Sequence, residues 1–238
     1  MPGAKRFSRI DQLLSGLGYG SRKDIDIGLK RGLVTVEGLD DPRSEMRVDP
    51  KLVRFNGEEL DNPDGLLVIL NKPAGYVCSH SEREGATVYE LLPERWNLRS
   101  PKIETIGRLD KDTTGLILLT DQHELVHFLT SPKNHVPKVY EATVEGPLDA
   151  RSIEIFASGK LLLSGEDKPC LPAKLEIVRE GLARVTIQEG RYHQVRRMLG
   201  AIGAPVLALK RIQFGQLNLE GIAEGSYRTI TPRLESIR

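Results

Sequence analysis

The 238-residue sequence has only two cysteines, Cys78 and Cys170, which stand far apart and have no Cys-x-x-Cys or Cys/His spacing. A disulfide framework and a zinc site are therefore not indicated, and two free thiols fit a reducing compartment. No apolar run approaches the roughly 18 residues that span a bilayer, and the opening MPGAKRFSRID lacks the apolar segment of a secretory signal. We therefore expect a cytoplasmic protein with no membrane partner.

The chain also has little net charge, +1, which by itself argues against a polyanionic partner. The charge is unevenly distributed, however. Residues 1–35 carry seven Lys or Arg, among them Lys5 and Arg6, against three Asp, and residues 190–211 carry five Lys or Arg and no acidic residue. Two separated basic segments on a near-neutral chain suggest a polyanion that is held at two places.

The positions of turn-forming residues in the sequence predict two modules. The turn-rich segment DNPDG is the best boundary candidate, and we place the modules at 1–62 and 63–238. In the first module, apolar residues at helical spacing predict a helix in SRIDQLLSG. Ser21 and Asp24 predict the capped start of a second helix that runs through Leu29, and the strand-like LVTVEG follows.

The second module reads as strands with scattered helices. Apolar runs at 66–71 and 116–120 predict central strands. TVYELLP predicts a helix, and a capping box at Asp121 predicts another that ends at Thr130. Further strand-like segments are VYEATVEG, AKLEIV, ARVTIQEG and VLALKRIQFGQLNL, and YHQVRRMLGAIG has helical spacing. This order predicts an α+β fold with a mixed, largely antiparallel sheet.

The stretch GRLDKDTTG places one carboxylate, Asp110, between an Arg-Leu pair and a turn that precedes an apolar strand. An Asp in such a loop most often forms an Asx turn or a cap. Asp112 raises the alternative of a two-carboxylate hydrolase of nucleosides or sugars, although its Thr-Thr-Gly context favours a turn. A glycosidic isomerisation needs only one carboxylate, because no water has to be activated.

Two other segments could assist such a carboxylate. GRYHQVRRM supplies cations at the start of a helix, where Arg196 could pair with Asp110 and hold it ionised. KVYEATV offers Tyr140 on a strand, where its ring can stack on a base and its hydroxyl can handle a proton. Taken alone, the cations fit a solvated helix face, and Tyr140 fits a half-buried tyrosine on a strand. Their combination favours catalysis.

In combination these segments resemble a known family. GRLD with the following TTGL, K-x-Y at 138–140, EGRYHQVRRM and L-x-R at 209–211 resemble the ordered motifs of the pseudouridine synthases. Residues 7–60 resemble the S4 RNA-binding domain through R-x-D-x-x-L, SRKD and VTVEG. With such a module in front, the match is to the RsuA/RluB group, which acts on ribosomal RNA. LTSPKNHVPKVYEATVEGPL and GEDKPCLPA resemble its small-subunit members most.

The resemblance implies a role for each matching residue. Asp110 attacks or deprotonates the ribose so that the bond from uracil N1 to C1′ breaks, and the base then rejoins through C5. Tyr140 stacks on the uracil and removes the C5 proton. Arg196 forms a salt bridge with the aspartate, Leu209 lies under the ring, and Arg108 helps to displace the target base. Further expected RNA contacts are Arg211, His193, Gln194, Arg22, Lys23 and Arg31.

The implied partner is ribosomal RNA of the 16S type, with no cofactor and no metal, and we expect a monomer. A synthase for 23S rRNA and a non-catalytic RNA-binding assembly factor on the same scaffold stay open as alternatives. The S4-like module departs from its pattern at Asp26, which would oppose phosphate binding, and at Gly28, which would weaken the helix by about 1 kcal/mol relative to Ala.

Overall fold

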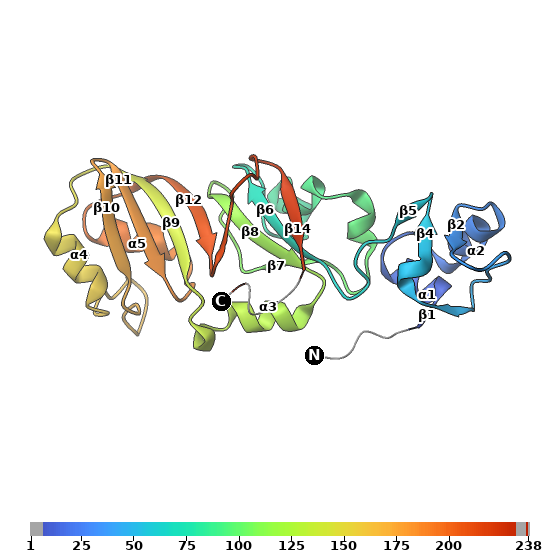
Figure 1. Cartoon of the computed structure of the whole chain (residues 1–238). Helices are drawn as coiled ribbons and strands as arrows, with labels where there is room; N and C mark the ends of the chain where they lie inside the picture. The colour runs from blue at the N-terminus through green and yellow to red at the C-terminus, as the bar shows by residue number, and fades with distance from the viewer. Residues whose placement is uncertain (1–6, 232–236, 238) are drawn as a thin grey trace.

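The computed structural model describes residues 7–231 and residue 237, so Lys5 and Arg6 of the basic N-terminal segment lie outside the described residues. The molecule is elongated, with the N-terminal module at one end and a large twisted sheet that extends to the other (Figure 1). Three clusters of buried apolar side chains hold it together, one in the N-terminal module and two in the remainder.

The N-terminal module consists of two helices on small sheets. Its elements are β1 (Ser8–Arg9), α1 (Ile10–Gly16), α2 (Arg22–Lys30), β2 (Val34–Val36), β3 (Arg47–Val48), η1 (Pro50–Leu52), β4 (Val53–Phe55) and β5 (Glu58–Glu59). Strands β2, β4 and β5 form a three-stranded antiparallel sheet, and β1 pairs with β3. The predicted capping box is confirmed, because the Ser21 and Asp24 side chains each accept from the other residue's backbone N–H.

The two departures on helix α2 have local explanations. A Cβ atom added to buried Gly28 would lie 3.3 Å from Cγ2 of Val34, so a larger residue would crowd the contact between α2 and β2. Asp26 forms an ion pair with Lys30 at 3.1 Å, one turn along the same helix. Glycine therefore serves close helix–strand contact, and the acidic charge is partly neutralised.

A nine-stranded sheet forms the second module. Its strands are β6 (Leu67–Lys72), β7 (Glu104–Ile106), β8 (Thr114–Thr120), β9 (Lys138–Val144), β10 (Lys174–Arg179), β11 (Leu182–Ile187), β12 (Val206–Phe214), β13 (Leu217–Asn218) and β14 (Tyr227–Ile230). The main path runs β10-β11-β9-β12-β8-β6-β14. Within the described residues β12 and β8 form the one parallel pair. The predicted α+β fold with a mixed, largely antiparallel sheet is confirmed.

Three α-helices and several short 3₁₀ turns surround this sheet. The α-helices are α3 (His123–Thr130), α4 (Ala150–Ala157) and α5 (Gln194–Ala201), and the turns are η2 (Glu82–Glu84), η3 (Val88–Leu91), η4 (Glu94–Leu98) and η5 (Pro132–Asn134). Helix α5 buries its apolar residues in the cluster on one sheet face and α3 buries Leu129 in the cluster on the other. No helix among the described residues has both the length and the apolarity to cross a membrane.

The structure corrects two helix predictions. TVYELLP forms only the 3₁₀ turn η3. The N-cap of α3 is Gln122, without a side-chain cap, and Asp121 does not cap the helix. The Asp121 carboxylate instead accepts from the backbone N–H of Leu66 at 2.8 Å and from the buried Arg99 guanidinium at 2.7 Å. A buried cation holds this carboxylate more strongly than an open helix end does.

A polar network joins the two modules. The Asp61 carboxylate accepts from Arg95 Nη2 at 2.7 Å and from Trp96 Nε1 at 2.9 Å, and Arg99 Nη1 lies 3.6 Å away. The Arg95 guanidinium also lies 4.9 Å from the ring centre of Tyr19 in the first module. These contacts fix the N-terminal module on the η4 turn. The exact boundary at residue 62 stays a prediction.

Candidate active site

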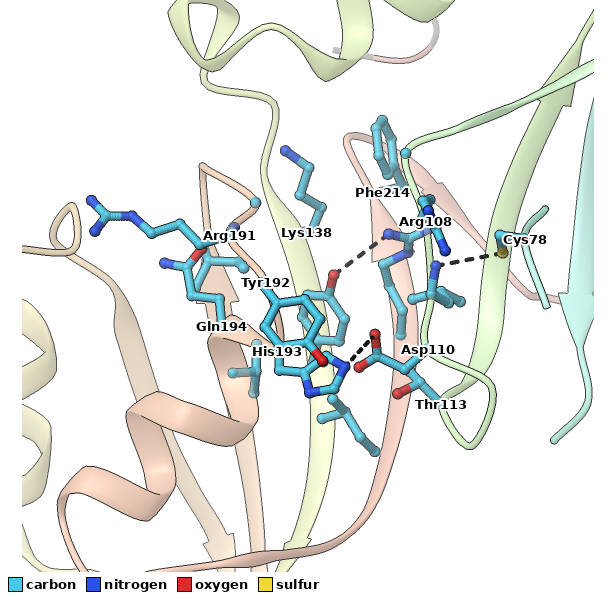
Figure 2. A pocket seen from close by; sticks show the side chains of 18 of the residues that line it. Cys78, Arg108, Asp110, Thr113, Lys138, Arg191, Tyr192, His193, Gln194 and Phe214 are labelled. Carbon is cyan, nitrogen blue, oxygen red and sulfur yellow. Dashed lines mark hydrogen bonds and ion pairs between the residues drawn. The ribbon is translucent and has the colours of Figure 1, made fainter. Parts of the chain in front are cut away.

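Asp110 opens onto a cavity of about 690 Å³ at the centre of the large sheet. One wall is the loop 107–113 that precedes β8, and the opposite wall is the loop 187–195 that leads into α5. The first residues of β9 and the middle of β12 form the floor between them (Figure 2). This volume lies within the usual range for ligand pockets, about 300 to 1,000 Å³. The segments that the sequence motifs singled out line most of the cavity, and residues of 77–84 and the end of α3 complete its lining.

Buried Lys72 at the end of β6 organises the loop that carries Asp110. Its ammonium donates to three backbone carbonyl oxygens, those of Thr113 at 2.7 Å, Pro73 at 3.1 Å and Lys111 at 3.2 Å. The Lys72 side chain is fully inaccessible to solvent, and this burial lowers the pKa of the lysine from its ordinary value. A cation surrounded by three carbonyl dipoles fixes the part of the loop directly after Asp110, at Lys111 and Thr113, against the end of β6.

The last glycine of GRLDKDTTG, Gly115, permits the close approach of β8 and β12. It has a φ of +99°, and an added Cβ would lie only 2.2 Å from the backbone oxygen of Arg211. No side chain fits there, because real Cβ atoms do not approach backbone that closely. The Thr-Thr-Gly turn therefore brings the Asp110 loop against the strand that carries Leu209 and Arg211.

Asp110 pairs with a histidine from the opposite wall. His193 Nε2 lies 3.3 Å from Asp110 Oδ1, and about a third of each side chain is exposed. His193 is the N-cap of α5 in the left-handed conformation, with φ of 47°, which is uncommon outside glycine. Its ring stacks on Tyr192 with centroids 3.8 Å apart, and Tyr192 is 76% exposed. The carboxylate is thus held at the mouth of the cavity.

The predicted salt bridge between Arg196 and Asp110 is wrong. Arg196 Nη2 instead lies 2.7 Å from Asp112 Oδ2, and its Nη1 donates to Val206 O at 3.4 Å. Arg196 stands three residues beyond the N-cap, nearly one helical turn and about 4.5 Å along the axis, so its side chain reaches the far side of the loop. Neither Arg196 nor Asp112 lines the cavity. Asp112 therefore acts as an anchor for α5, which disfavours a two-carboxylate site.

Tyr140 lies on the floor with Arg211 beside it. Both are buried, at 8% and 2% exposure, on neighbouring strands where they are directly paired. Arg211 Nε donates to Leu116 O at 2.7 Å, and its Nη1 makes a long hydrogen bond to the Tyr140 hydroxyl at 3.5 Å. No carboxylate pairs with Arg211 among the described residues, and its Nη2 has no partner there. The positive charge of Arg211 is therefore available to the phenol.

The other predicted residues divide into two groups. Leu209, buried on the floor, and Arg108, exposed on the rim, both line the cavity, as Gln194 does. The hydrogen bonds of Gln194 are internal, however: its amide accepts from Arg191 N at 2.9 Å and donates to Glu189 Oε1 at 2.7 Å. Gln194 thus shapes the wall, whereas Arg108 and Leu209 face the space that a ligand would fill.

The remaining predicted contacts lie outside the cavity. Arg22, Lys23 and Arg31 are exposed on and just after helix α2 of the N-terminal module. Arg22 Nε lies 4.0 Å from the buried Asp11 carboxylate, and about two thirds of its side chain is exposed. These cations form a separate basic surface, and their contact with RNA stays a prediction.

Several lining residues were not among the predicted site residues, although Lys138 and Tyr192 stand within the quoted motifs K-x-Y and EGRYHQVRRM. They are Cys78, Lys138, Tyr192 and Phe214, and Lys72 supports the wall from behind. Two of these five residues left a signal. Lys72 ends a buried strand whose first four residues, LVIL, are apolar, and Lys138 is two residues before Tyr140, hence on the same strand face. Cys78 accepts from Leu109 N at 3.5 Å, and burial raises the pKa of its thiol.

The charge of Lys138 makes the stability of the free protein depend on pH. Burial, followed by the nearby Arg211 cation, lowers the pKa of Lys138 from 10.5 to about 8. Between these two pH values the unfolded chain binds the proton and the folded chain does not, so stability rises with pH. Lys138→Met removes this rise. We expect it to stabilise the protein on the order of 2 kcal/mol below pH 8, with a margin that shrinks toward pH 10.5.

Urea unfolding of the parent and the variant at pH 7 and pH 10 measures this margin. Lys133→Met, which removes an exposed lysine on the neighbouring turn η5, is the control and should show a similar small effect at both pH values. An equal effect of Lys138→Met at both pH values would contradict the assignment of a lowered pKa to Lys138.

Comparison with known proteins decides the family. Residues 66–201 match the sequence profile described as RNA pseudouridylate synthase. The chain belongs to the RNA pseudouridylate synthase family. The chain is 38% identical over 226 residues to ribosomal small subunit pseudouridine synthase A of Pasteurella multocida, which covers 94% of this chain and 96% of the relative. RNA pseudouridine synthase YtzG of Bacillus subtilis is 36% identical, with 94% and 95% covered.

A solved pseudouridylate synthase has the same fold, with a TM-score of 0.65, 34% sequence identity and coverage of 94% of this chain and 96% of that chain. The protein is therefore a pseudouridine synthase, and the predicted enzyme class is confirmed. The region matched by the family profile contains Asp110, Tyr140 and Arg196, whereas the N-terminal module lies outside it. The S4 resemblance of that module stays a prediction. Among the described residues no group of three or more His, Cys, Asp or Glu is arranged to hold a metal ion.

Proposed function

We propose that this pseudouridine synthase isomerises a uridine of 16S ribosomal RNA and that Asp110 is its catalytic residue. The observation that carries the site assignment is that one cavity is lined at once by a carboxylate, a buried tyrosine and a buried leucine. The small-subunit substrate is supported by the similarity to several enzymes named ribosomal small subunit pseudouridine synthase A. The Lys138–Val144 strand and its flanks also resemble those enzymes.

Asp110 acts on the ribose in the first step. The carboxylate at the cavity mouth, about a third of which is exposed, can reach a sugar that enters from solvent, while the base lies deeper against Leu209. Either attack at C1′ or removal of a ribose proton releases uracil, with the electron pair of the N1–C1′ bond going to N1. In the free enzyme the Asp110 carboxylate is paired with His193, so the entering ribose either displaces His193 or shares the carboxylate with it.

Tyr140 acts on the base after it has turned. A new bond from C1′ to C5 leaves an extra proton on C5, and this proton must be removed while N1 gains one, so the atoms of the reaction balance. The Tyr140 hydroxyl oxygen accepts a long hydrogen bond from Arg211 Nη1, which helps to position this oxygen for the proton on C5. The apolar side chains of Ile187, Leu209 and Phe214 on the cavity lining can hold the free base by contact with its ring.

Arg108 and the N-terminal module handle the RNA around the target. Extruding a base from structured RNA costs a few kcal/mol of lost stacking and pairing. Arg108, exposed on the rim two residues before Asp110, can occupy the space that the base leaves. The basic surface of helix α2 is directed to solvent and suits phosphate contacts.

Parallel modification of two substrates tests the assignment. Purified protein is incubated with unmodified 16S and 23S rRNA, and pseudouridine is mapped by carbodiimide adducts and primer extension. We expect a single new stop in 16S rRNA and none in 23S rRNA. A stop only in 23S rRNA would show that 23S rRNA, and not 16S rRNA, is the substrate. Binding of RNA without any stop would favour the non-catalytic assembly factor.

Tyr140→Phe should reduce pseudouridine formation by at least about 100-fold while RNA binding is retained, because the ring remains but the proton acceptor is lost. Tritium release from RNA labelled at uridine C5, measured in single turnover, reports this step. Tyr192→Phe is the matched control, since it removes a hydroxyl from another ring of the same cavity and should keep near-parent rates. Equal rates for Tyr140→Phe and the parent would remove Tyr140 from the mechanism.

Replacement of Arg22 and Lys23 by alanine should weaken RNA binding in a salt-dependent way. Each lost phosphate contact lowers the slope of log affinity against log salt by about 0.7 to 0.9. Filter binding at several salt concentrations measures the slope. Lys30→Ala, on the same helix but paired with Asp26, is the control and should change it less. An unchanged affinity of the double variant at low salt would remove helix α2 from the RNA interface.

A further inference from the structure

Lys138 is the one cation on the floor of the cavity whose side chain reaches solvent in part. As the first residue of β9 it shares the strand face of Tyr140, and its register neighbours are Ile187 on β11 and Phe214 on β12. All of these residues line the cavity. Figure 2 shows the Lys138 ammonium and the Asp110 carboxylate apart from each other in the cavity.

The Lys138 ammonium has no ionic partner in the described part of the chain. Its contact there is the Phe214 ring, with the nitrogen 5.5 Å from the centroid, and the Arg211 guanidinium lies 5.4 Å from the same centroid. Glu189 is the acidic group near Lys138, but its carboxylate already accepts from Arg191 Nε at 3.1 Å and Gln194 Nε2 at 2.7 Å. Two cations thus share one aromatic ring without a free anion between them.

This arrangement is unfavourable in the free enzyme and becomes favourable when an anion enters. Burial and repulsion from Arg211 both lower the pKa of Lys138, to about 8, so at neutral pH the side chain is still charged. Cations on the rim such as Arg108 and Lys111 are exposed, so water stabilises their charge when no ligand is bound. A partly dehydrated cation without a partner attracts an incoming anion more strongly.

We propose that Lys138 binds a backbone phosphate adjacent to the flipped uridine and so positions the nucleotide between Tyr140 and Asp110. The uracil and the ribose of the entering nucleotide are neutral, so its phosphates are the groups that complement this charge. The separation of Lys138 from Asp110 along the cavity places the phosphate site away from the ribose chemistry. This inference rests on the proposed function, because it assumes that a nucleotide of RNA occupies the cavity.

A cycle of protein and RNA changes tests the contact. The probes are short 16S rRNA fragments around the mapped uridine, with a normal phosphate or a neutral methylphosphonate on either side of it. A 2′-O-methyl group at that linkage in both versions keeps the neutral strand intact. The proteins are the parent, Lys138→Met, Lys138→Arg and the control Lys133→Met, and dissociation constants are measured by fluorescence anisotropy at pH 7.

We expect Lys138→Met to weaken binding of the normal RNA by about 10- to 100-fold, as for loss of a charge-assisted hydrogen bond. One of the two methylphosphonates should weaken binding to the parent by a similar factor and should have no further effect on Lys138→Met. Lys138→Arg should retain most of the affinity, and Lys133→Met should bind as the parent does. A melting temperature of Lys138→Met at or above that of the parent excludes misfolding as the cause.

Two results would overturn the phosphate contact. In the first, each methylphosphonate weakens binding to Lys138→Met by the same factor as binding to the parent. In the second, neither methylphosphonate changes the affinity of the parent. Either result leaves the proposed function standing, provided the parent converts the mapped uridine. Absence of pseudouridine in both 16S and 23S rRNA would overturn the proposed function together with this inference.

Discussion

Replacement of Asp110 by asparagine is expected to lower the single-turnover rate of pseudouridine formation by at least about 10³-fold, with RNA affinity changed little. Asparagine keeps the size and much of the hydrogen bonding of the side chain, so the loop held by Lys72 should stay in place. Asparagine can neither attack C1′ nor accept a ribose proton. The variant therefore separates the chemistry from the binding that surrounds it.

Asp112→Asn is the matched control, because it makes the same change two residues away. Asp112 lies outside the cavity and pairs with Arg196 at 2.7 Å, with about two thirds of its side chain exposed. Loss of this partly exposed pair should cost at most about 1 kcal/mol of stability and leave the rate within about tenfold of the parent. A Asp112→Asn variant as inactive as Asp110→Asn would revive the two-carboxylate hydrolase. An active Asp110→Asn variant would remove Asp110 from the catalytic role.

Lys72→Met is expected to destabilise the protein by about 2 to 4 kcal/mol, although methionine relieves the burial of a charge. The reason is that the carbonyls of Pro73, Lys111 and Thr113 lose their shared donor, and each unsatisfied buried acceptor costs about 1 to 3 kcal/mol. Because two of these carbonyls, those of Lys111 and Thr113, directly follow Asp110, the loop should also loosen. A displacement of about 1 Å can lower the rate about 100-fold.

Thermal unfolding and single-turnover rates, the latter measured well below the melting temperature, separate the two effects of Lys72→Met. Lys102→Met, an exposed lysine of the same module, should change stability by no more than about 0.5 kcal/mol. A Lys72→Met variant with parent stability and parent rate would show that the loop is held by its other contacts, such as Gly75 N to Lys111 O at 2.8 Å.

The strands were predictable from the sequence because the large sheet separates two apolar clusters. Strands β6 and β8 are buried on both faces and therefore read as continuous apolar runs at 66–71 and 116–120. Local chemistry at the Ser21–Asp24 capping box was also sufficient, because both partners stand three residues apart on one helix end. The 3₁₀ turn at Val88–Leu91 was not predictable, since a single short turn has the same spacing as a helix start.

The site was only partly predictable because pairings between distant segments depend on how the walls meet. The sequence correctly predicted that the GRYHQVRRM segment lies near Asp110, but it did not predict which side chains pair. His193 pairs with Asp110, while Arg196 pairs with Asp112. The same limit applies to Asp121, which was expected to cap α3 and instead holds Arg99 within the second module. Buried Lys72 contacts backbone carbonyls, which leave no trace in residue identities.

The most direct test of the central claim measures the fate of the base rather than its rate of loss. Unmodified 16S rRNA is incubated with the parent protein, digested to nucleosides, and analysed by liquid chromatography and mass spectrometry together with the small molecules released. A carboxylate and a tyrosine acting in one cavity predict one pseudouridine for each uridine consumed, with no change in RNA mass and no free uracil. Free uracil in proportion to abasic sites would contradict this account, because the glycosidic bond would then be hydrolysed instead of rejoined at C5.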